Sequence, residues 1–130
     1  MTPDEESIRA VLALHPESEL AILFGSLAAG EARADRDVDL AIDTGQPLTA
    51  EAIMDWIGEI AQCTGRPVDL IDLQTVGEPL LGQILEHGKR LAGADTAYAE
   101  LIKRHLFAEA DFMPYQRRIL AERRKSWFSK

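Results

Sequence analysis

The chain has 130 residues, enough for one domain and too few for two of ordinary size. Its composition, 46% apolar and 28% charged, is typical of a globular protein, and one cysteine excludes an internal disulfide framework. The net charge is −8, with −13 over residues 1–100 and +5 over residues 101–130, and an acidic body disfavours nonspecific duplex binding. The N-terminus lacks a signal-peptide pattern and no apolar run is long enough to cross a membrane. We therefore expect a cytoplasmic protein with no membrane association and no direct nucleic-acid binding.

The predicted elements alternate between helices and strands. Thr2 and Pro3 open the first helix, with Glu5 completing a capping box. Short apolar runs predict strands at 19–24, 37–43 and 66–73, with a brief fourth strand at 89–93. Helical patterns follow at 26–34, with Ser26 as N-cap, and at 49–65, 77–88 and from 95 onward, with a break at Pro114. This order predicts an α/β fold in which helices pack on a small sheet.

In the helix at 49–65, Thr49 is the expected N-cap and Gly65 the expected end. The apolar spacing predicts that one face of this helix is buried, formed by Ile53, Ile57, Ile60 and Ala61.

Two aspartates lie one residue apart at the start of the second predicted strand. Because strand side chains alternate, Asp37 and Asp39 project from the same face and repel each other unless a cation neutralises them. Oxygen ligands of this kind favour Mg²⁺. The third strand carries Asp69 and Asp72 on opposite faces, so only one of them can join the pair. We favour Asp69, which lies in mid-strand where a carboxylate has no packing role.

A Gly-Ser pair precedes the first acid by ten residues, directly after the first strand. Gly25 lets the backbone approach a ligand closely, and Ser26 adds a hydroxyl and free N–H groups that favour phosphate. Either motif alone is typical of an ordinary turn. Together with three acids on neighbouring strands, the pair predicts metal-dependent nucleotidyl transfer.

Gly25-Ser26, the ten-residue gap, Asp37-Val38-Asp39 and Asp69 resemble the signature of the DNA-polymerase-β-type nucleotidyltransferases. The likeness is greatest to the minimal nucleotidyltransferase (MNT) family and covers about residues 4–95. It implies a mixed sheet, Mg²⁺ on the acids, a third acid that helps to activate the attacking hydroxyl, and a nucleoside triphosphate donor. The residue before the first metal aspartate is often Ser in this family. Here it is Arg36, which we assign to the nucleotide-binding set.

The segment from the third strand to a long helical tail resembles the MntA-type antitoxins of HEPN–MNT toxin–antitoxin pairs. That resemblance implies transfer of AMP from ATP to a hydroxyl, expected to be a tyrosine, of a HEPN-domain RNase toxin encoded nearby. We divide the chain into a nucleotidyltransferase domain at 1–95 and a helical extension at 96–130. Two alternatives stay open: neutralisation by binding alone, and a transferase that acts on a small molecule or an RNA end.

The C-terminal extension is basic and rich in apolar side chains. We expect the segment 115–130 to dock on the partner protein, with packing on the chain's own body as the alternative.

Overall fold

The strands and helices follow one another in the predicted order. The computed structural model of the chain describes residues 1–31, 33 and 35–110. The elements in chain order are α1 (Pro3–Ala13), β1 (Leu20–Phe24), α2 (Gly25–Ala28), β2 (Val38–Asp43), α3 (Ala50–Thr64), β3 (Val68–Asp72), α4 (Leu80–His87) and β4 (Lys89–Gly93). A further helix begins at residue 95 and continues through residue 110.

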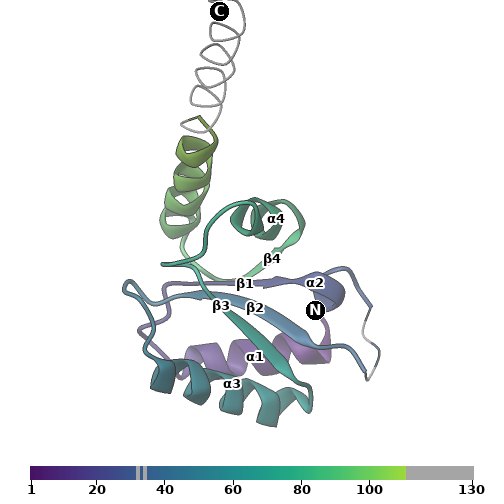
Figure 1. The fold of residues 1–130 in the computed structure, drawn as a ribbon. Helices are drawn as coiled ribbons and strands as arrows, with labels where there is room; N and C mark the ends of the chain where they lie inside the picture. Colours follow the sequence, from purple (N-terminus) through teal and green to yellow (C-terminus); the bar gives the residue numbers. More distant parts are fainter. Residues whose placement is uncertain (32, 34, 111–130) are drawn as a thin grey trace, which may run out of the picture.

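The four strands form one mixed sheet in the order β3-β2-β1-β4. β1 is antiparallel to β2 and β4, whereas β2 and β3 are parallel. Helices α1 and α3 lie on one face of the sheet, and α4 and the helix 95–110 lie on the other (Figure 1). The expectation of an α/β fold with a small mixed sheet is confirmed.

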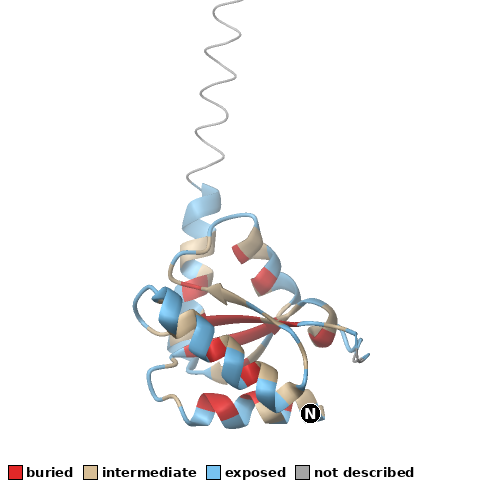
Figure 2. Ribbon diagram, turned by 60° about the horizontal axis from the view of Figure 1, so that its bottom comes forward, coloured by how far each residue is buried: buried red, intermediate tan, exposed pale blue. Residues whose placement is uncertain are grey.

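Strand alternation divides the core between the two faces of the sheet. On one face, Leu23 and Leu40 pack in a cluster with Ile8 of α1 and Ile60 of α3. On the other face, Ile22 belongs to a second cluster. Its members are the buried residues Leu20, Ile22, Ala41, Leu73, Leu81, Ile84 and Leu101. The buried residues follow the sheet and the inner sides of the helices (Figure 2).

The helix ends follow the predicted caps, with one difference. The hydroxyl oxygens of Thr2 and Thr49 accept hydrogen bonds from backbone N–H groups at the starts of α1 and α3, over 3.2 and 3.1 Å. Gly65 ends α3 in the left-handed conformation, at φ 69°. Glu5 uses its carboxylate differently from a capping box: it is 3% exposed and accepts bonds from Lys89 Nζ, at 3.0 and 3.1 Å. This ion pair ties α1 to β4.

Two predicted helices differ in detail from the structure. α2 is a single turn of four residues that begins at Gly25, and its N-cap residue is Phe24 rather than Ser26. In α3, Trp56 and Ile60 are the buried residues, whereas Ile57 is only half-buried. The buried stripe of α3 is therefore rotated by about one residue from the predicted one.

The helix 95–110 packs on the body of the protein through its first turns. Leu101 is buried with Leu81 and Ile84 of α4, whereas Leu106 and Phe107 are 56% and 59% exposed. The expected break at Pro114 and the expected docking segment 115–130 lie outside the described residues. The division between 95 and 96 stays a prediction. No helix in the described part of the chain is long and apolar enough to span a bilayer.

Candidate active site

Asp39 and Asp69 lie side by side across the parallel strands β2 and β3. The register pairs the two residues directly, so their side chains project from the same face of the sheet. Asp37 is exposed and comes just before β2, two residues ahead of Asp39. The structure therefore brings the three predicted acids to one end of the β2–β3 pair.

The three carboxylates act on one another electrostatically. Burial of Asp39 raises the pKa of its carboxyl above the ordinary value, and the negative charges of Asp69 and Asp37 raise it further. A carboxylate under like-charge repulsion of this kind is stabilised when a cation approaches. The donor set consists of carboxylate oxygens alone, which suits a hard ion such as Mg²⁺.

Gly25 lies against the Asp39 carboxylate and borders this acidic site. Phe24 pairs with Asp39 across the antiparallel strands β1 and β2, so the next residue of the chain turns over the carboxylate. Gly25 has φ 71°, and a Cβ atom built on it would overlap the Asp39 carboxylate, at 3.0 Å from Cγ. Only glycine allows the backbone this close to the acid, because any side chain would displace Asp39.

Asp72 lies on the other face of the sheet from Asp69, as strand parity predicts, and it has a structural part. It pairs in register with Ile42, three residues along β3 from Asp69 and on the opposite face. Its two carboxylate oxygens accept hydrogen bonds from the backbone N–H groups of Leu48 and Gln74, at 2.8 and 2.9 Å. Asp72 thus fixes the loops at the far end of the sheet and is not part of the acidic site.

Arg36 lies in the loop between α2 and β2, beside a cavity of about 480 Å³. Its guanidinium forms an ion pair with Glu31, Nη2 to Oε2 at 3.5 Å, and its buried Nε atom has no hydrogen-bond partner among the described residues. Its carbonyl oxygen accepts a bond from Arg66 Nη1, at 3.1 Å. The cavity is lined by Gly30, Glu31, Arg33 and Arg36. The assignment of Arg36 to the nucleotide stays a prediction.

The acids do not form a complete ion cage by themselves. In residues 1–31, 33 and 35–110, no three His, Cys, Asp or Glu side chains are grouped closely enough to hold a metal ion. Mg²⁺ in proteins is usually held by one or two carboxylates together with waters and substrate phosphates, so a nucleotide would supply the remaining ligands. The metal-binding and catalytic roles of Asp37, Asp39 and Asp69 therefore stay predictions.

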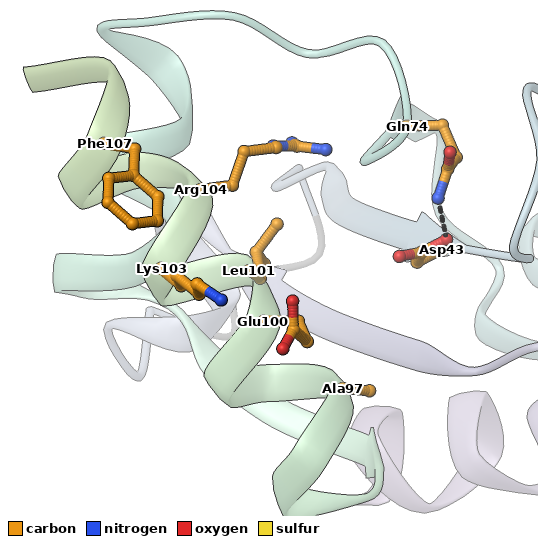
Figure 3. Close-up of a pocket in the computed structure, with 8 residues that line it drawn as sticks. All are labelled: Asp43, Gln74, Ala97, Glu100, Leu101, Lys103, Arg104 and Phe107. Atoms are coloured by element: carbon orange, nitrogen blue, oxygen red, sulfur yellow. Dashed lines mark hydrogen bonds between the residues drawn. The ribbon is translucent and has the colours of Figure 1, made fainter. Parts of the chain in front are cut away.

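Sequence analysis missed a second cavity, of about 400 Å³, at the other end of β2 (Figure 3). It lies between the helix 95–110 and the strand end at Asp43, whose carboxylate accepts a bond from Gln74 Nε2 at 2.8 Å. The lining residues are Asp43, Gln74, Ala97, Glu100, Leu101, Lys103, Arg104 and Phe107. The basic and apolar side chains of the C-terminal extension were the signal for it in the sequence.

Part of the chain is similar in sequence to an adenylyltransferase. Protein adenylyltransferase MntA of Shewanella oneidensis is 31% identical to the chain over 78 residues, which is 60% of this chain and 56% of MntA. The match thus spans little more than half of that relative.

Solved structures show the same fold. A crystal structure of a toxin–antitoxin with AMP-PNP matches 91% of this chain and 96% of its own, at 24% identity and a TM-score of 0.76. A structure of a tri-AMPylated Shewanella oneidensis HEPN toxin in complex with MNT antitoxin matches 92% and 97%, at 20% identity and a TM-score of 0.70.

A family model shows to which protein family the chain belongs. The model described as polymerase beta, nucleotidyltransferase, matches residues 6–97, which include β1 to β4 and every acid of the site. Since this match covers well over half of the chain, the protein belongs to the polymerase beta nucleotidyltransferase family.

Proposed function

We propose that this protein is an ATP-dependent adenylyltransferase that acts as an antitoxin in the cytoplasm. It moves AMP from ATP onto a hydroxyl, expected to be a tyrosine, of a HEPN-domain toxin encoded nearby and so neutralises the toxin. The observation that carries the proposal is the in-register pairing of Asp39 with Asp69 beneath the Gly25 turn. The similarity to MntA and to a complex with an AMPylated toxin supports the substrate class.

The residues present fit a magnesium–nucleotide complex. The raised pKa of Asp39 reflects its burial and two neighbouring carboxylates, and the turn at Gly25 leaves no side chain between backbone and acid. Asp37 and Asp39, with Asp69 beside them, would hold one or two Mg²⁺ ions. When bound, these ions neutralise charge on the phosphates and on the attacking oxygen.

The chain's own groups have distinct parts in the proposed reaction. Gly25 and Ser26 offer backbone N–H groups and a hydroxyl to the triphosphate, and Arg36 offers a guanidinium. Asp69 accepts the proton of the acceptor hydroxyl. The hydroxyl oxygen then forms a bond to the α-phosphorus, the bond from that phosphorus to the pyrophosphate oxygen breaks, and pyrophosphate leaves.

The test is transfer of label from ATP to the toxin. The purified protein is incubated with α-³²P-labelled ATP, Mg²⁺ and the HEPN-domain protein from the same genome, and label on the toxin is measured. We expect labelling with the wild type and with Asp72→Asn, and none with Asp39→Asn. Unlabelled toxin that is nevertheless inhibited would favour neutralisation by binding. Label on an RNA or a small molecule alone would favour the third candidate function.

A further inference from the structure

The cationic side chain of Arg104 lines the cavity between the helix 95–110 and the end of β2. Arg104 Nη2 is buried, yet it has no hydrogen-bond partner among the described residues. Figure 3 shows the Arg104 side chain extending from the helix toward the Gln74–Asp43 pair. The nearby Asp43 carboxylate accepts bonds through Oδ1 from Gln74 Nε2 and the Gly45 N–H, both at 2.8 Å, and it gives Nη2 of Arg104 no hydrogen bond. A buried donor without a partner is costly, so a carboxylate from outside would be bound favourably.

Apolar surface borders this cation. Phe107 lines the cavity and is 59% exposed, and Leu106 beside it is 56% exposed. The Lys103 ammonium lies 5.8 Å from the centre of the Phe107 ring and adds positive charge at the rim. Exposed aromatic surface next to an arginine is the composition typical of protein–protein contact points.

The cavity lies within reach of a partner that also contacts the acids. Asp39, Ala41 and Asp43 alternate onto the same face of β2, so the cavity is four residues, or about 13 Å, from Asp39 along the strand. A standard interface buries about 800 Å² on each partner, a patch roughly 30 Å across. One bound protein can therefore fill the cavity and present a hydroxyl to the acids.

We propose that this cavity is an anchoring site for the partner toxin, in which a carboxylate of the toxin pairs with Arg104 and an adjacent apolar side chain packs on Phe107. The inference rests on the proposed function, since it assigns a docking point to the same acceptor protein. Arg104 is here a positioning residue, remote from the reacting atoms.

The experiment measures toxin affinity without ATP and transfer with ATP, on the full chain. Arg104→Gln removes the charge, Arg104→Glu reverses it, and Phe107→Ser removes the apolar contact. Arg9→Glu, an exposed position on α1 at the opposite face of the sheet, is the matched charge-reversal control. Thermal melting of each variant verifies that it is folded, and Arg104→Gln avoids placing a second acid one turn from Glu100.

We expect Kd for the toxin to rise about tenfold in Arg104→Gln and Phe107→Ser and about 100-fold in Arg104→Glu, with Arg9→Glu unchanged. KM for the toxin should rise in parallel while kcat stays within about twofold of the wild type. Folded Arg104 and Phe107 variants that bind the toxin as tightly as Arg9→Glu would overturn this inference and leave the proposed function intact. A wild type that neither binds nor labels the toxin would overturn both. A wild-type dimer that Arg104→Gln dissociates would assign the cavity to a second copy and also overturn the inference.

Discussion

Replacement of Asp39 by Asn should stabilise the free protein while abolishing its activity. The pKa of Asp39 is raised in the folded state by burial and by Asp69 and Asp37. A raised carboxyl pKa means that the charged form is less stable in the folded protein than in the unfolded chain. The charged Asp39 carboxylate therefore lowers the free energy of unfolding as pH rises through its raised pKa. A neutral Asn removes this destabilisation at neutral pH.

The size of the gain follows from the spacing of the strands. Asp39 and Asp69 are neighbours on paired strands, and paired strands are about 4.8 Å apart. Two unit charges about 5 Å apart repel by about 1 kcal/mol in water and about 3 kcal/mol at an effective dielectric constant of 20. Because Asp69 is exposed, the lower figure applies, and a gain of about 1 kcal/mol raises Tm by about 3–4 °C in a domain of this size.

Asp72→Asn is the matched control, because the same chemical change should have the opposite effects. Asp72 accepts two backbone hydrogen bonds, and an amide can keep only one of them, at a cost of about 1–2 kcal/mol. We measure Tm in magnesium-free buffer with EDTA and AMP transfer with Mg²⁺. Asp39→Asn should melt higher and lose about 100-fold or more of its activity, while Asp72→Asn melts lower and stays active. An Asp39→Asn protein that melts below the wild type, or transfers AMP at the wild-type rate, would refute this reasoning.

Three further predictions test other parts of the site and fold. Gly25→Ala should lose activity and stability because its Cβ overlaps Asp39. Gly30 has a similar positive φ with open space around it, so the control Gly30→Ala should lose only about 1 kcal/mol of stability and stay active. Equal activities of the two variants would contradict this. Asp69→Asn should lower kcat far more than ATP affinity, as single-turnover and binding measurements would establish. A hydrogen bond to Glu78 raises the pKa of His105, so the protonated imidazole stabilises the folded protein. This stabilisation is complete below about pH 6.5 and is lost as pH rises through the raised pKa. His105→Gln should therefore flatten the Tm–pH curve above about pH 6.5, and an unchanged curve would show that the pair is not coupled to folding.

The fold and the placement of the acids were predictable because both follow from local periodicity. The two-residue repeat of strands separated Asp69 from Asp72, and the register of β2 with β3 agrees, since it pairs Asp69 with Asp39 and Asp72 with Ile42. Caps such as Thr49 and Gly65 act within one turn of the helix, so the sequence near them suffices to predict helix ends.

Features that depend on packing between distant segments were not predictable. The Ala-rich run after Gly25 favours a helix, yet α2 stops after one turn. Trp56 is buried because α1 and α3 pack together around it, and spacing alone could not distinguish this rotation of α3 from one centred on Ile57. The cavity at Arg104 is formed by β2, the turn after β3 and the last described helix, three segments that no local pattern connects.

The order of the site across the sheet suits the proposed transfer of AMP to another protein. Gly25, Asp39 and Asp69 occupy the ends of β1, β2 and β3, three adjacent strands, so they form a row about 10 Å long. Under the proposed function the triphosphate lies at the β1 end of this row and the acceptor hydroxyl at the β3 end. β3 is the last strand of the sheet in the described part of the chain, so the acceptor approaches over an edge rather than into a cleft. A site that is open on its acceptor side needs the acceptor itself to exclude water and to be held in place. A protein acceptor anchored about 13 Å away on the same face of β2 would meet both requirements, which a free small molecule would not.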